Sequence, residues 1–155
     1  MNNFEQTTIS IGIDTGTHTG FAVWDNKGKI FLELKSYSII EAIERFNFYN
    51  FNGDYKIKTV RIEDVRQNKP IFSYRLADSK SVRYSLSIAQ RVGMVKRDCA
   101  IWEELMKNSG VNFQMVRPTK TTMTKLNSQT FKNITKYQER TNEHTRDAGM
   151  LVFGL

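Results

Sequence analysis

The sequence has little of what builds disulfide-framed, fibrous or membrane-spanning proteins. One cysteine, Cys99, stands among 155 residues, so no disulfide can form within the chain and a secreted, disulfide-rich scaffold is excluded. Glycine and proline number only nine and two, which excludes collagen-like and low-complexity chains. No apolar run approaches the roughly 18 residues that cross a membrane. Residues 1–6 lack the basic and apolar regions of a signal peptide, and we therefore expect a cytoplasmic protein with no membrane partner.

The residues that are present predict one globular domain spanning 1–155. Hydrophobic residues make up 39% of the chain and aromatic residues 12%, enough apolar mass for one sizeable core. The length is that of a single ordinary domain. We see no internal repeat, low-complexity tract or domain boundary.

The positive charge is concentrated in the second part of the chain. The formal net charge is +7, with 23 basic and 16 acidic side chains. Residues 1–60 hold 6 basic and 7 acidic side chains, whereas residues 61–155 hold 17 and 9, a net of +8. Such a surface suits a polyanion such as nucleic acid, although many soluble proteins are mildly basic.

Hydrophobic periodicity predicts an α/β fold. Three segments with strand character and turn residues between them indicate an antiparallel meander, and a helix before the fourth strand indicates a parallel crossover. The predicted strands are 7–14, 21–24, 29–37, 56–65 and 111–116; the predicted helices are 39–49, 81–108 and 141–155, with a loop at 66–79 and a short helix, followed by a loop or second helix, within 119–137. We expect a five-stranded mixed sheet, three antiparallel strands followed by parallel additions, flanked by helices on both faces.

The long helix over 81–108 has two apolar stripes. One runs with 4-3-4-3-4 spacing from Ile88 to Met106, and the other, of smaller residues, runs from Val82 to Ala100. Burial of both stripes within one subunit is one interpretation. Pairing of part of this helix with a second copy of the chain is the other.

Acidic residues follow two of the predicted strands. Asp14 ends the first and Glu63 comes near the end of the fourth, with Asp64 equally acidic next to it. If the two strands are parallel neighbours, their carboxylates meet at the carboxyl edge of the sheet, where α/β folds bind ligands. His144 and Asp147, three residues apart on the last helix, share one face and could join them.

Such a cluster suits a divalent cation. Carboxylates held close together repel one another, and Mg²⁺ prefers oxygen ligands and bridges to phosphate. Two ions could activate a water and stabilise the leaving oxygen of a phosphodiester. As a direct ligand, the imidazole of His144 suits Mn²⁺ better than Mg²⁺. Alternatively, it could orient or deprotonate the attacking water. Each residue also has an ordinary interpretation: Asp14 as a turn residue, the others as solvated charges or a core histidine.

Five stretches together resemble RuvC-type Holliday-junction resolvases of the RNase H-like superfamily, over about residues 9–153. They are IGIDTGTHTGFA at 11–22, RIEDV at 61–65, QRVG at 90–93, RPTKTT at 117–122 and HTRDA at 144–148. Within the second stretch the family pattern selects Glu63 rather than Asp64 as the site acid.

The resemblance implies a homodimer that binds four-way DNA junctions and cuts two strands, in a bacterial or phage-infected cell. It implies Mg²⁺ or Mn²⁺, two ions in each active site and no small-molecule cofactor, with Asp14, Glu63, His144 and Asp147 as ligands or water activators. Lys120 would then contact the scissile phosphate as a catalytic cation. The expected DNA contacts are Arg66, Lys69, Phe72, Tyr74, Arg117, Lys120, Lys125 and Lys132.

Two positions depart from the family pattern. Thr15 stands where proline is common, and Arg66 stands where an aromatic wedge is often found three residues after the second acid. Phe72 or Tyr74 could stack on unpaired bases instead. A branched-DNA or flap endonuclease and a catalytically silent DNA-binding dimer therefore remain alternatives.

An ATPase or sugar-kinase-like domain, suggested by the sequence from Asp14 to Thr17, would need a second such domain that 155 residues cannot supply.

Overall fold

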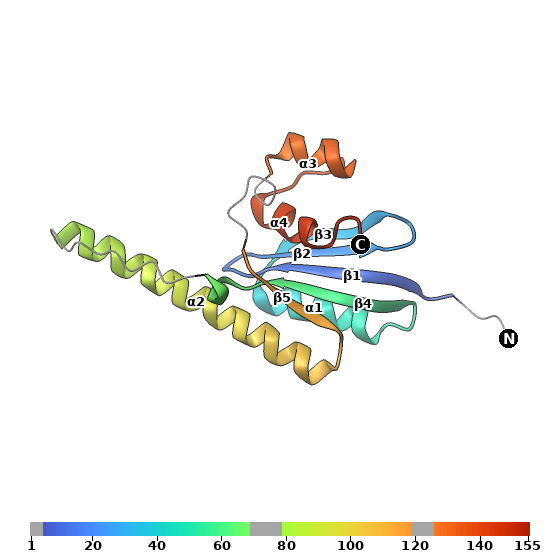
Figure 1. Ribbon diagram of the computed structural model, residues 1–155, viewed down its shortest axis with the longest axis horizontal. Coiled ribbons are helices and arrows are strands. Elements are labelled where there is room, and N and C mark those ends of the chain that lie inside the picture. The colour runs from blue at the N-terminus through green and yellow to red at the C-terminus, as the bar shows by residue number, and fades with distance from the viewer. Residues whose placement is uncertain (1–4, 69–78, 119–125) are drawn as a thin grey trace.

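The protein forms a five-stranded mixed sheet with the strand order β3-β2-β1-β4-β5 (Figure 1). The structure is a computed structural model that describes residues 5–68, 79–118 and 126–155. The strands are β1 (Thr7–Asp14), β2 (Thr19–Asp25), β3 (Ile30–Tyr37), β4 (Tyr55–Glu63) and β5 (Phe113–Val116). β1, β2 and β3 pair antiparallel, β4 lies parallel to β1, and β5 lies parallel to β4. The predicted fold class is confirmed.

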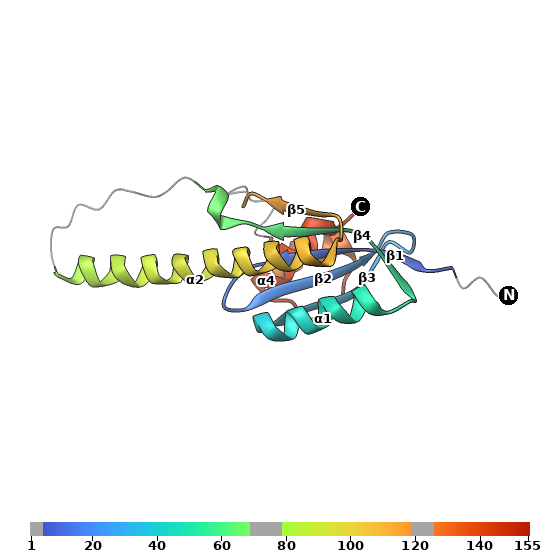
Figure 2. The ribbon, with the colours of Figure 1, turned by 90° about the horizontal axis from the view of Figure 1, so that it is seen from below.

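Helices cover both faces of this sheet. They are α1 (Ile39–Phe51), the short 3₁₀ helix η1 (Val65–Gln67), α2 (Ser79–Ser109), α3 (Ser128–Thr135) and α4 (Glu143–Val152). α1 and the last part of α2 lie on one face, α4 lies on the other, and α3 stacks outside α4 (Figures 1 and 2). Within the described ranges no helix is long and apolar enough to pass through a bilayer.

Alternation along the strands creates two cores. Ile9, Ile11 and Ile13 of β1 point to the face of α1 and α2, where they pack with Phe46 and Trp102. On the other face, a smaller aromatic core joins the sheet to α3 and α4; it contains Ala22, Trp24, Leu34, Phe131, Ala148 and Val152. Both faces of β1 are therefore buried, and the carboxyl ends of β1 and β4 lie between the two helical layers.

Side-chain caps set where two helices begin. Ser38 and Glu41 form a reciprocal capping box at the start of α1. The last helix begins later than the sequence predicts: Asn142, not Thr141, is the N-cap of α4, and the helix ends at Val152. The Asn142 side chain accepts a hydrogen bond from the Thr145 N–H at 2.9 Å, so Asn142 outcompetes its neighbour for the capping position.

The interpretation that both apolar stripes of α2 are buried within one subunit is wrong for the first half of the helix. Its last turns bury Cys99, Trp102 and Met106 against the sheet. Its first half projects beyond the sheet (Figures 1 and 2), where Leu86 of one stripe and Val92 of the other are 64% and 43% exposed. Met94, which lies outside both stripes, is 52% exposed. A helix of 31 residues is about 46 Å long, more than a short-stranded sheet can cover.

Candidate active site at the carboxyl ends of the strands

The register of β1 and β4 places Asp14 beside Glu63. Ile13 of β1 pairs with Ile62 of β4, so the next residue of each strand occupies the adjoining position at the same edge. Gly12 and Arg61, two residues earlier, face α4: a Cβ on Gly12 would meet the backbone of α4, and Arg61 donates to the Leu151 carbonyl at 3.1 Å. Since side chains alternate along a strand, Asp14 and Glu63 are directed to the same face.

Two glycines let α4 lie directly on the sheet at this edge. A Cβ on Gly12 would lie 2.2 Å from the Ala148 carbonyl oxygen, and one on Gly20 would lie 2.0 Å from the His144 carbonyl oxygen. No real Cβ makes such contacts, so only glycine admits the helix this closely. Gly20 pairs with Asp14 across β1 and β2. The close approach therefore sets the first turn of α4 over the end of β1.

This seating brings His144 into contact with Asp14. The imidazole Nδ1 and the Asp14 carboxylate Oδ2 are 2.9 Å apart. The hydrogen bond to Asp14 raises the pKa of His144 and outweighs burial, which acts in the opposite direction. The nearby negative charges of Glu143 and Asp147 raise it further. Asp147 is buried about one helical turn after His144, so α4 adds a second acid to the same region.

Thr15 ties the two strand ends together. Its hydroxyl donates to the Glu63 carbonyl at 3.0 Å and lies 3.2 Å from the Cys99 sulfur of α2. Burial raises the pKa of the Cys99 thiol, which makes it unreactive. The threonine that departs from the family pattern therefore has a structural role, because it couples the backbone after Asp14 to the backbone at Glu63.

The structure separates Glu63 from its acidic neighbour Asp64. Asp64 is buried, caps η1, and receives the Arg66 guanidinium Nε at 2.7 Å. Burial by itself would raise the pKa of Asp64, but the bonds from Arg66 hold it below its usual value. Asp64 is thus committed to local structure, and Glu63 is the acid directed to the face of α4.

Among the residues described, no group of three or more His, Cys, Asp or Glu side chains is arranged to hold a metal ion. The structure brings Asp14 and His144 into contact, and it sets Glu63 and Asp147 at the adjoining strand and helix positions.

The predicted DNA contacts are distributed unevenly. Arg117 is exposed directly after β5, at the same edge of the sheet as Asp14. Arg66 is engaged by Asp64 and by Glu103 of α2, the latter at 2.7 Å. Lys132 is half-buried on α3. The remaining predicted contacts lie outside the described residues: Lys69, Phe72, Tyr74, Lys120 and Lys125.

His18 is a site residue that the sequence analysis did not single out. It is exposed in the connection between β1 and β2, and its ring centroid is 6.3 Å from that of His144. Its place four residues after Asp14, within the first motif, is the signal that could have identified it.

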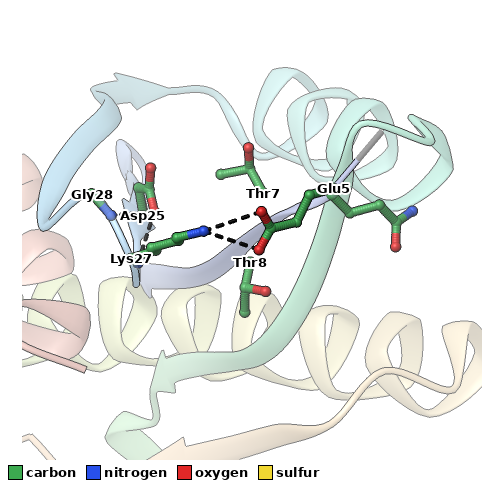
Figure 3. A pocket seen from close by; sticks show the side chains of 7 residues that line it. Glu5, Thr7, Thr8, Asp25, Lys27 and Gly28 are labelled. Atoms are coloured by element: carbon green, nitrogen blue, oxygen red, sulfur yellow. Dashed lines mark hydrogen bonds and ion pairs between the residues drawn. The ribbon is translucent and has the colours of Figure 1, made fainter. Parts of the chain in front are cut away.

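A pocket at the opposite edge of the sheet offers a contrast (Figure 3). It is lined by Glu5, Asp25 and Lys27 with the start of β1, and the Lys27 ammonium pairs with Glu5 at 3.0 Å. Its acid and base are exposed and neutralise each other. At the edge that carries Asp14, by contrast, the acid is buried and holds an imidazole whose pKa it raises.

Comparison with known proteins supports the fold. No protein-family model and no curated protein matches the sequence. Among solved structures, the chain is similar to T. thermophilus RuvC in complex with a Holliday junction substrate, with a TM-score of 0.52 and 17% identity over 94% of this chain and 91% of that chain. At this identity the likeness establishes the fold alone. The chain has the RNase H-like fold of RuvC, as its motifs predicted.

Proposed function

We propose that this protein is a metal-dependent endonuclease that resolves four-way DNA junctions by phosphodiester hydrolysis. The observation that carries the proposal is the meeting of Asp14, Glu63 and the first turn of α4 at one edge of the sheet, with His144 bonded to Asp14 at 2.9 Å. The structural neighbour is a RuvC bound to a Holliday junction substrate, which favours branched DNA as the substrate class.

The chemical types of these donors, rather than their present arrangement, suit a divalent cation. The pKa of His144 responds to the negative charges of Asp14, Glu143 and Asp147, so this edge holds an excess of negative charge that a cation would balance. Carboxylate oxygens with one imidazole suit Mg²⁺ or Mn²⁺. Asp14, Glu63 and Asp147 would hold up to two ions, with His144 acting on the attacking water; the ions would supply a more acidic water and charge stabilisation at the phosphate.

The chain's own groups orient the reaction. Asp14 binds the Nδ1 side of His144 and so fixes the ring, which leaves Nε2 to exchange a proton with the attacking water. Thr15, through the Glu63 carbonyl, holds the two acidic strand ends in register. Lys120 would stabilise charge on the scissile phosphate.

The direct test compares junction, flap and linear duplex DNA with and without Mg²⁺ or Mn²⁺. We expect metal-dependent cleavage that is strongest on the junction and is lost in Asp14→Asn. Asp54→Asn makes the same change at an exposed turn by the other edge of the sheet and should cleave as the wild type does. Equal cleavage by Asp14→Asn would contradict the assignment. Equal use of flaps would favour the branched-DNA alternative, and binding without cleavage the silent dimer.

We further propose that the protein acts as a homodimer joined through the first half of α2. Cutting two strands of one junction needs two active sites, and Leu86 and Met94 present apolar area away from the subunit's own core. Sedimentation equilibrium should show a dimer that Leu86→Glu with Met94→Glu dissociates. Phe51→Glu places the same acid on an exposed apolar site of α1 and should leave the dimer intact. A wild-type monomer at micromolar concentration would contradict this proposal.

A further inference from the structure

Two imidazole rings lie at the candidate active site, and the mechanism proposed above uses only that of His144. The second belongs to His18, in the connection between β1 and β2, and its ring centroid is 6.3 Å from that of His144. This connection lies at the end of the sheet over which α4 begins (Figure 1). The two ring planes are tilted by 49° and are not stacked. A strand connection and a helix therefore bring one imidazole each to the same place.

The two rings are accessible, whereas the acids beside them are buried. Asp14 and Asp147 are only 7% and 9% exposed. The side chain of His144 is 33% exposed, and His18 is exposed in the connection. A DNA phosphate that reaches this edge from solvent therefore comes within reach of both imidazoles.

The backbone on either side of His18 is held in place. The Thr15 hydroxyl donates to the Glu63 carbonyl at 3.0 Å, and the Thr19 hydroxyl donates to the Gly16 carbonyl at 3.4 Å. Asp14, before the connection, pairs with Gly20 after it. The position of His18 relative to Asp14 is thus set before a substrate binds, and a donor that is already in place loses little freedom on binding.

The imidazole of His18 is available for a new hydrogen bond. With the residues that the structure describes it forms no hydrogen bond and no ion pair, whereas Nδ1 of His144 is occupied by Asp14. An imidazole carries an N–H donor whether it is neutral or charged. His18 can therefore donate to a phosphate oxygen in either protonation state.

The separation of the two rings matches the size of one reacting phosphate group. A hydrogen bond from nitrogen to oxygen is about 2.9 Å long, so two such bonds that converge on a phosphate and its attacking water place their nitrogens roughly 6 Å apart. The ring centroids of His18 and His144 are 6.3 Å apart. His144 can thus act on the attacking water while His18 reaches an oxygen of the same phosphate.

We infer that His18 is a second catalytic imidazole, which donates a hydrogen bond to a non-bridging oxygen of the scissile phosphate. The inference rests on the proposed nuclease function and adds to it a residue that contacts the reacting group. Negative charge increases on the phosphate oxygens as the water attacks, so a fixed donor stabilises the transition state more than the bound substrate. His18 transfers no proton in this step, because the proton of the attacking water passes to His144.

Substitutions that separate the ring of His18 from its N–H donor test this role. His18→Phe keeps an aromatic ring without nitrogen, and we expect single-turnover cleavage of a four-way junction at saturating protein to slow by about 10- to 100-fold. His18→Asn and His18→Gln place an amide N–H near the positions of Nδ1 and Nε2, and one of the two should restore most of the rate. Thr17→Ala, at the neighbouring exposed position, should change the rate by less than about twofold.

Binding and stability measurements distinguish this role from a general DNA contact or a structural one. The junction affinity, measured by anisotropy without divalent metal, should change by less than about twofold in His18→Phe, since a contact that strengthens in the transition state adds little to ground-state binding. The Tm should stay within about 2 °C of the wild type, because His18 is exposed. Weaker binding with an unchanged rate at saturating protein would overturn the inference.

Sulfur substitution at the scissile phosphate locates the contact. Each of the two phosphorothioate diastereomers replaces one non-bridging oxygen by sulfur, a poorer hydrogen-bond acceptor. Mn²⁺ tolerates sulfur better than Mg²⁺, so reactions in Mn²⁺ limit the effect of sulfur on the metal ions. One diastereomer should slow the wild type several-fold and have little further effect on His18→Phe. Equal effects of sulfur on the two proteins would contradict a contact between His18 and this phosphate.

The outcomes also separate the two proposals. If the wild type cleaves junctions and His18→Phe cleaves them at the same rate, the role of His18 is wrong and the nuclease assignment stands. If the wild type cleaves no branched DNA with either metal, both are wrong.

Discussion

The close contact between α4 and β2 predicts a large effect of one methyl group at Gly20. In Gly20→Ala the new Cβ would lie 2.0 Å from the His144 carbonyl oxygen and 3.2 Å from the Ala148 Cβ. Ordinary carbon–oxygen contacts are about 3.3–3.6 Å, so the first turn of α4 must retreat by more than about 1 Å. The bond between His144 and Asp14, 2.9 Å long, then opens to about 4 Å, which is beyond hydrogen-bonding reach.

Both stability and activity should respond. Overpacking costs about 1–3 kcal/mol, and the lost bond to a charged group adds to it, so we expect the free energy of unfolding to fall by about 3 kcal/mol. For a chain of this size that lowers the Tm by roughly 6–12 °C. Because a displacement of about 1 Å at reacting groups can cost about 100-fold in rate, junction cleavage should fall by about that factor well below the Tm.

Thermal unfolding followed by circular dichroism and single-turnover cleavage of a labelled junction measure the two effects. Gly53→Ala is the matched control, since a Cβ there meets nothing within 4 Å, and it should be neutral or slightly stabilising. If Gly20→Ala melts and cleaves as the wild type does, the close packing of α4 on Gly20 does not position His144 against Asp14.

Three further predictions concern the frame around the site. Glu33 is 8% exposed, and its carboxylate accepts hydrogen bonds from Arg45 and two tyrosines; burial alone would raise its pKa, but these bonds hold the pKa below its usual value. Glu33→Gln should therefore lower the free energy of unfolding in urea by about 2 kcal/mol at pH 7. This difference should shrink as the pH falls below about 4.5 and the wild-type carboxylate is protonated. Phe131→Ala removes the buried ring that packs α3 against Gly149 of α4 and should lower the free energy of unfolding by about 3 kcal/mol. Unchanged stability would contradict this packing. Arg66→Ala leaves the buried Asp64 without its guanidinium and should destabilise by about 1–3 kcal/mol, whereas a residue used only for DNA would alter binding and not the Tm.

Local sequence determined most of the elements. The alternation of Ile9, Ile11 and Ile13 defines β1 at its observed bounds, because a strand with one apolar face needs only period-two patterning. The capping chemistry of Ser38 and Glu41 likewise fixes the start of α1. The crossover through α1 predicted the parallel pairing of β1 with β4, since a helix between two strands returns the chain in the same direction. The placing of Asp14 next to Glu63 therefore follows from the order of elements.

Tertiary structure alone decided how α4 and α2 complete the molecule. In the sequence, Gly12 lies within a predicted strand and Gly20 in the connection to the next one, yet both admit α4, and this depends on a helix more than 120 residues later. The apolar stripes of α2 continue past the edge of the sheet, because helical periodicity reports which face is apolar and cannot report how far the sheet beneath it extends. The pocket between Ser36 of β3 and the segment 139–142 joins residues about a hundred positions apart, and a gap between surfaces leaves no pattern in a sequence. The pattern of apolar and polar side chains follows the geometry of the helix or strand that carries them, so it can be read from the sequence. Contacts between helices and strands are fixed only when the whole core packs.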